Sequence, residues 1–235
     1  MNLTAIMTEL SELGTEQTKK TLLRHGVNEP LFGVKIGDMK KQLVKKVKAA
    51  DLSLELFETG NYDAQYLAGL TADPKKITKS ELLHWAEIAN SKSIREAIVA
   101  SLTAETPYAT ELANFWIHER NEKFESTGWS CYANYLSIAP NEEINQDEVL
   151  LLLEKVEQTI HNAKNGVRYT MNNFVIATGT YYPPLLQKAE AVAKKIGTVY
   201  VDMGDTACKV PVASSYIEKA VQMDRVGKKR KRAIC

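Results

Sequence analysis

The side chains with the most evident chemistry in this sequence are lysines and arginines that recur at close spacing. Lys40, Lys41 and Lys45 flank a narrow apolar stripe and form the basic face of an expected helix. A second run fills six of eight positions near the C-terminus: Arg225, Lys228, Lys229, Arg230, Lys231 and Arg232. Lysine and arginine bind nucleic acids by displacing condensed counterions, so both runs, with Arg95 and Arg168, are candidate nucleic-acid contacts. The alternatives are a solvated helix face and a disordered, solubilising terminus.

The net charge of +1 conceals a strong asymmetry along the chain. Residues 1–48 carry nine basic side chains against five acidic ones, whereas residues 105–160 carry eleven acids. Without the C-terminal run the chain would have 24 basic and 29 acidic side chains. A nearly neutral protein can therefore still present a cationic surface to a polyanion.

Nucleophilic and metal-ligating residues show no catalytic spacing. Cys131, Cys208 and Cys235 are odd in number and far apart, and the histidines fall on different expected helices. We therefore expect no disulfide framework, no metal site and no cofactor, and a reducing cytoplasm fits best. Asp202, Asp205, Cys208 and Lys209 form a polar cluster, for which an ordered loop is the simplest interpretation.

Helix-length apolar stripes fill most of the chain and predict the elements that position these residues. After two short N-terminal helices we expect successive pairs, which have the size of units in a helical solenoid. The expected helices span residues 37–49 and 51–59, 62–73 and 78–90, 92–103 and 106–119, 122–138 and 145–161, and 165–179 and 183–196. The β-branched and glycine-containing segment 197–212 predicts an extended stretch before a final helix. No apolar run approaches the roughly 20 residues that span a membrane.

One motif resembles a known family. Its residues are Phe32-Gly33-Val34-Lys35-Ile36-Gly37-Asp38-Met39-Lys40-Lys41. This run, with the succession of helix pairs after it, resembles the DNA alkylation repair family, the AlkD-like glycosylases, over roughly residues 20–196. The resemblance implies a curved stack of HEAT-like repeats whose concave side binds duplex DNA. Residues 197–235 look more like uncharacterised relatives than like the active enzymes.

The resemblance also implies where catalytic residues would stand. Active members carry a tryptophan four residues before an aspartate, and the carboxylate stabilises the positive charge that develops as the glycosidic bond breaks. Here Ser91 and Arg95 occupy those positions, while Ser126 and Asn173 replace a family arginine and aromatic. A unit charge ~4 Å away contributes on the order of 4 kcal/mol, and exchanging a carboxylate for a guanidinium reverses its sign. Glu96 follows Arg95 but would point about 100° away on an α-helix.

These observations lead to an all-α HEAT-like solenoid, a single domain of residues 1–235 with a basic tail at 225–235. We expect a cytoplasmic protein that binds double-stranded DNA through backbone and shape, with glycosylase chemistry lost or altered. One alternative is an active alkylpurine DNA glycosylase. Another is a non-enzymatic helical scaffold for a protein partner, favoured if the acids of 105–160 line the binding groove. Neither requires a membrane.

Overall fold

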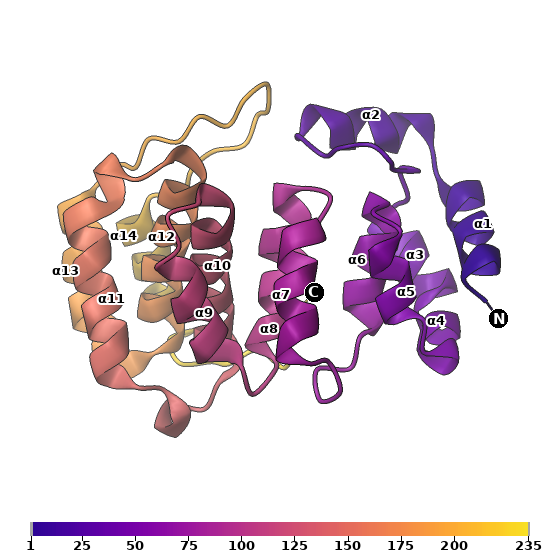
Figure 1. The fold of residues 1–235 in the computed structure, drawn as a ribbon. Coiled ribbons are helices and arrows are strands. Elements are labelled where there is room, and N and C mark those ends of the chain that lie inside the picture. Colours follow the sequence, from indigo (N-terminus) through magenta and orange to yellow (C-terminus); the bar gives the residue numbers. More distant parts are fainter. Residues whose placement is uncertain (1, 235) are drawn as a thin grey trace. The chain divides into compact units, whose positions relative to one another are not determined.

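The computed structural model describes residues 2–234, and no strand is assigned within that range (Figure 1). An isolated antiparallel bridge joins Gly14 to Val34. The described chain divides into two compact units. Unit 1 contains residues 2–107, 204–206 and 234, and unit 2 contains residues 108–203 and 207–233. The all-α class expected from the sequence is confirmed.

Unit 1 consists of short helices. They are α1 (Leu3–Leu13), α2 (Glu16–Arg24), α3 (Ile36–Gln42), α4 (Val44–Ala50), α5 (Ser53–Glu58), α6 (Tyr62–Thr71), α7 (Lys79–Ile88), the π-helix η1 (Ile94–Val99) and α8 (Ala100–Ala104). The expected helix 37–49 is two helices, broken at Leu43. The expected helix 92–103 begins as a π-helix, in which the Ala100 N–H bonds to the Arg95 carbonyl five residues back. Thr78 and Glu81 form the capping box that opens α7.

Unit 2 is built from longer helices. They are α9 (Ala109–Ile117), α10 (Glu122–Ile138), η2 (Asn141–Glu143), α11 (Gln146–Thr159), η3 (Ile160–Asn162), α12 (Asn165–Tyr181), η4 (Pro183–Leu185), α13 (Leu186–Ile196) and α14 (Ala213–Gln222). α10 packs against α9 and α12, and α12 also packs against α13 and α14 (Figure 1). Of the expected pairs, α12 with α13 is observed, whereas α11, the expected partner of α10, packs mainly against α12 and α13.

Aromatic side chains fill the core of each unit. In unit 1, Phe57 and Trp85 stack with ring centroids 3.9 Å apart and both are buried. In unit 2, Phe174 of α12 forms edge-to-face pairs with Trp129 and Tyr132 of α10, at 5.2 and 5.7 Å between ring centroids. Such pairs contribute about 0.5–1.5 kcal/mol beyond the burial of their area, and they fix α10 against α12.

The motif at Phe32–Val34 is held by a buried carboxylate, that of Asp63 in the first turn of α6. Asp63 Oδ2 accepts the N–H groups of Phe32 at 2.6 Å and Gly33 at 3.0 Å, and its Oδ1 accepts that of Val34 at 2.9 Å. Gly33 has φ +81°, and a Cβ there would lie 2.5 Å from the Lys19 backbone nitrogen. The loop therefore needs both a glycine and an acceptor of three N–H groups.

The position of α14 depends on Gly179 of α12. A Cβ at Gly179 would lie 2.7 Å from Cδ1 of Ile217, so the absence of a side chain lets α14 approach α12 closely. Ile217 is fully buried at this contact.

The segment between α13 and α14 is not a strand. Its backbone is bound by side chains from the start of α12 instead of by a neighbouring strand. The Asp202 N–H donates to Asn165 Oδ1 at 2.8 Å, Asn165 Nδ2 donates to the Asp202 carbonyl, and Arg168 Nη1 donates to the Tyr200 carbonyl at 3.3 Å. The expected extended stretch is therefore an irregular loop.

The clamp at Asp63 predicts a stability effect. In Asp63→Asn, an NH2 group replaces one of the two carboxylate oxygens. That NH2 group cannot accept a hydrogen bond, so at least one buried backbone N–H of the loop loses its acceptor. We expect a loss of about 2–3 kcal/mol in the free energy of unfolding, measured by urea denaturation. The control Asp73→Asn alters an exposed turn residue and should change stability by less than about 0.5 kcal/mol. Equal losses in the two variants would contradict the clamp.

Candidate nucleic-acid interface

The basic C-terminal segment is folded onto unit 2 over residues 227–230. The Gly227 N–H donates to the Thr180 carbonyl, Lys229 Nζ to the Leu136 carbonyl and the Arg230 N–H to the Ser137 carbonyl, each at 2.8 Å. These carbonyls lie in the last turns of α12 and α10, where helix carbonyls lack intrahelical partners and the helix dipole favours cations. The segment is thereby fixed across the ends of two helices.

Lys229 is half-buried in the segment. Its ammonium lies 6.0 Å from the centre of the Tyr182 ring. Burial lowers the pKa of Lys229 to about 8, against an opposing attraction to Glu142. Beyond it, Lys231 and Arg232 are exposed. The described chain ends in unit 1, where the Ile234 N–H donates to Glu105 Oε1 at 3.1 Å. Cys235, the last residue of the expected tail, lies outside the described residues.

Two adjoining hollows lie beside this segment, within unit 2, with volumes of about 530 and 370 Å³. They share the side chains of Ile176, Tyr181, Tyr216 and Arg230. We call them together the C-terminal groove. The first is further lined by Thr180, Lys219, Ala220, Met223, Arg225 and Lys228, and the second by Ala133, Asn134, Ser137, Tyr169, Asn173, Ala177, Lys209 and Pro211.

Helical spacing places these side chains on common faces. On α12 the lining residues Tyr169, Asn173, Ile176 and Thr180 follow one another at intervals of four, three and four, which is one face of an α-helix. On α14, Tyr216, Lys219 and Ala220 share one face in the same way, and Met223 follows directly after the helix. Sequence reasoning missed the groove, although the polar and aromatic side chains on this face of α12 gave a signal.

The charge of the C-terminal groove has one sign. Five lining residues are cations: Lys209, Lys219, Arg225, Lys228 and Arg230. No aspartate or glutamate is among the lining residues of either hollow. The acids of 105–160 lie outside the lining, and several have other partners. Glu157 is paired with Lys195, Glu154 lies 3.9 Å from Lys188, and Glu148 accepts the Tyr132 hydroxyl at 2.5 Å.

The other sequence-predicted contacts lie apart from this groove's lining. Lys40 and Lys41 are exposed in the last turn of α3 and Lys45 is exposed on α4, all in unit 1. Arg168 Nε donates to the Ala163 carbonyl at 2.7 Å in addition to its bond to Tyr200. Part of the hydrogen-bonding capacity of Arg168 is therefore used within the fold. The nucleic-acid contacts expected of these residues stay predictions.

Arg95 is held inside unit 1 on η1. Its Nη1 donates to the Ala89 carbonyl at the end of α7 at 3.2 Å, and its Nε has no hydrogen-bond partner among the described residues. Burial lowers the pKa of Arg95 from its ordinary value. A guanidinium thus occupies the position at which the resemblance places a catalytic carboxylate, and its role in binding DNA stays a prediction.

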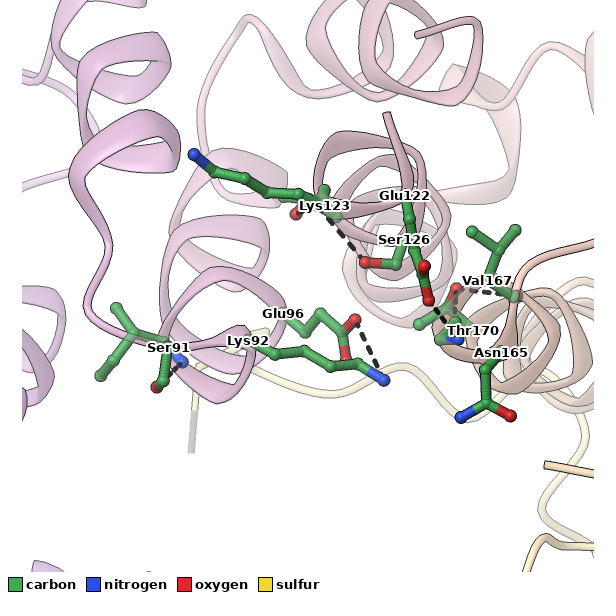
Figure 2. Close-up of polar contacts among 12 residues, drawn as sticks. Ser91, Lys92, Glu96, Glu122, Lys123, Ser126, Asn165, Val167 and Thr170 are labelled. Carbon is green, nitrogen blue, oxygen red and sulfur yellow. Dashed lines mark hydrogen bonds and ion pairs between the residues drawn. The ribbon is translucent and has the colours of Figure 1, made fainter. Parts of the chain in front are cut away.

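The other candidate positions are also occupied by structural contacts within their own units (Figure 2). Ser91 is buried, with its hydroxyl 3.0 Å from that of Ser93, and Ser126 donates to the Lys123 carbonyl at 3.4 Å. In unit 1, Glu96 lies 3.8 Å from Lys92 as an ion pair one turn apart, and the side chain of Glu96 is 15% exposed. In unit 2, Glu122 Oε1 accepts the Gly166 N–H at the start of α12 at 2.7 Å. Asn173, the fourth candidate position, lines the C-terminal groove.

Comparison with known proteins decides the family. Residues 6–199 match the family described as DNA alkylation repair enzyme. The chain belongs to the DNA alkylation repair enzyme family. The resemblance seen at Phe32–Lys41 is thereby confirmed.

Similar proteins occur in Listeria. An uncharacterised protein of Listeria monocytogenes is 36% identical over 219 residues, which cover 91% of this chain and 94% of that protein. An uncharacterised protein of Listeria innocua is 35% identical over the same lengths. A solved structure with a TM-score of 0.91 and 36% identity covers 100% of both chains. It is described as a new family of proteins related to the HEAT-like repeat DNA glycosylases with affinity for branched DNA structures. The HEAT-like repeat fold is therefore confirmed.

Two further properties bear on the class of protein. Among residues 2–234, no group of three or more His, Cys, Asp or Glu side chains is arranged to hold a metal ion. None of the described helices has the length and apolar character needed to cross a membrane.

The burial of Lys229 predicts a pH dependence of stability. Folded Lys229 releases its proton near pH 8, whereas the unfolded chain keeps it until near the ordinary lysine value of 10.5. Between these values the unfolded state binds more protons, so the contribution of Lys229 to stability rises with pH. The stability of the wild type relative to Lys229→Met should therefore increase from about pH 7.5 to about pH 10, measured by denaturant unfolding.

The exposed neighbour provides the control for this titration. Wild type and Lys231→Met should follow parallel curves over the same range, since Lys231 is exposed. A stability difference between wild type and Lys229→Met that is flat or falls with pH would show that Lys229 is not desolvated at Leu136.

Proposed function

We propose that this protein binds branched double-stranded DNA through the C-terminal groove of unit 2 and does not excise bases. The observation that carries the proposal is the positive charge of the groove lining, which contains five cations and no carboxylate. The family acts in DNA alkylation repair, and the similar solved protein is described as having affinity for branched DNA. The cytoplasmic location expected from the cysteines belongs to the same proposal.

The distribution of charge supports DNA over an acidic or neutral partner. Lys219 and Arg225 lie together along one hollow, where each can neutralise a phosphate, and Lys228 beside them is paired with the exposed Asp224. A basic protein partner would be repelled by the same surface, and the acids that would suit it are absent from the lining. Phosphate contacts position DNA without reading its sequence, so recognition through shape follows.

The loss of excision rests on Arg95. A cation beside a developing positive charge raises the barrier that a carboxylate would lower. Glu96 is a poor substitute for the family's catalytic carboxylate, because its side chain is largely buried and paired with Lys92. The positions of the family's other catalytic residues are Ser91, Ser126 and Asn173, none of which carries a charge.

Binding and its salt dependence give the first test of function. We expect a four-way junction to bind more tightly than a linear duplex of the same sequence, measured by fluorescence anisotropy between about 50 and 200 mM salt. Lys219→Ala should weaken binding and reduce the slope of log K against log salt by about 0.9. Lys194→Ala is the matched control, since Lys194 is also exposed in the last turn of a unit 2 helix but lies outside the groove lining. Equal slopes for the two variants would remove the groove from the interface.

Base release gives the second test. On alkylated duplex DNA the wild type should release no 3-methyladenine or 7-methylguanine above the uncatalysed background, because Arg95 stands at the carboxylate position. Chromatography of the released bases measures this, with an active alkylpurine glycosylase as positive control. Robust release that persists in Arg95→Ala would show that the protein is an enzyme whose carboxylate comes from another residue.

A further inference from the structure

The C-terminal groove holds more than phosphate binding requires. Cations alone neutralise a DNA backbone. This groove also carries three tyrosines, Tyr169, Tyr181 and Tyr216, and two asparagine side chains, Asn134 and Asn173. Its volumes of about 530 and 370 Å³ fall in the range of pockets that take small organic ligands, about 300–1,000 Å³. Aromatic rings, amides and cations together match the parts of a nucleotide.

Tyr216 is placed to offer an aromatic face. It lies on α14 in the wall common to both hollows, and it is 56% exposed. Apolar side chains adjoin it in the lining, including Ile176 and Ala220, and Met223 follows two turns later with 46% exposure. An exposed tyrosine in an apolar recess provides a surface on which a base can stack.

Hydrogen-bonding groups in the groove are available to a ligand. The side chains of Tyr181, Tyr216 and Asn173 form no hydrogen bond with any residue of the described range 2–234. An asparagine amide both donates and accepts, so it can bind the edge of any base. Lys219, Lys228 and Arg230 lie in the first hollow with Tyr216, and Lys228 is paired there with the exposed Asp224 at 2.7 Å, a partner that a phosphate of the bound strand would displace.

We propose that the C-terminal groove receives an unpaired nucleotide of a DNA strand, with its base on Tyr216, its edge at Asn173 and its phosphates at Lys219, Lys228 and Arg230. A base in a continuous duplex is stacked on both faces and cannot reach such a platform, whereas an unpaired base can. This inference rests on the proposed function, because a branch point is where unpaired nucleotides adjoin duplex DNA. The inference specifies which part of branched DNA the groove binds, namely an unpaired nucleotide.

The experiment compares a fully paired four-way junction with the same junction carrying two unpaired thymines at its centre. Wild type should bind the unpaired junction more tightly. Tyr216→Ala should lose about 5- to 150-fold in affinity for the unpaired junction, the range for removing one stacking platform, and much less for the paired one. Tyr216→Phe keeps the ring and should keep the preference. Because Tyr216 is exposed, these variants should fold, which circular dichroism checks.

Phe115→Ala serves as the matched control. Phe115 is an aromatic of unit 2 with 52% exposure, on α9 and outside the groove lining, so its removal should leave both affinities unchanged. A 2-aminopurine at the unpaired position reports stacking directly. Its fluorescence should be quenched by wild type and Tyr216→Phe and remain unquenched with Tyr216→Ala.

The outcomes separate the two proposals. If neither junction binds, or if binding does not weaken as the salt concentration rises, the proposed function fails. If both junctions bind equally and Tyr216→Ala changes neither affinity nor quenching, the function stands and the nucleotide inference is overturned. Free thymidine monophosphate is the third probe. If it binds as tightly as the unpaired junction and depends on Tyr216, the groove takes a free nucleotide and the assignment to a DNA strand is overturned.

Discussion

The carbonyl groups at the ends of α10 and α12 fix the C-terminal segment, and the proposed interface depends on that contact. Thr180, Leu136 and Ser137 accept the Gly227 N–H, the Lys229 ammonium and the Arg230 N–H. A segment with six cations in eight positions would repel itself in solution. Bound to helix ends that carry partial negative charge, it becomes one wall of a groove.

The same contact brings the cations of the C-terminal segment beside the polar helix faces of the fold. The DNA alkylation repair fold supplies helices whose faces carry tyrosines and asparagines, and the C-terminal segment adds cations to them. Elsewhere, in unit 1, Arg95 stands where the resemblance places a carboxylate and is tied to the end of α7. The DNA binding and the absence of excision that we propose are therefore compatible within one chain, because they depend on different residues.

Much of the fold could be predicted from the sequence because apolar spacing is local. The range expected for α10 is 122–138, and the structure has the helix at those residues. The groove could not be predicted, since the bond from Lys229 to Leu136 joins residues 93 positions apart. Their charge makes Arg95 and Arg168 candidate contacts to nucleic acid, but the sequence does not show that both guanidinium groups donate to backbone carbonyls. Asp63 was missed because its three partners precede it by about 30 residues.

Lysine footprinting tests the central claim most directly, that DNA lies against the C-terminal groove. The protein is acetylated with and without a bound four-way junction, and the modified lysines are measured by mass spectrometry. The account predicts that Lys209, Lys219 and Lys228 are protected by DNA while Lys194 on α13 keeps its reactivity. Unchanged reactivity of the three groove lysines in a saturated complex would contradict it.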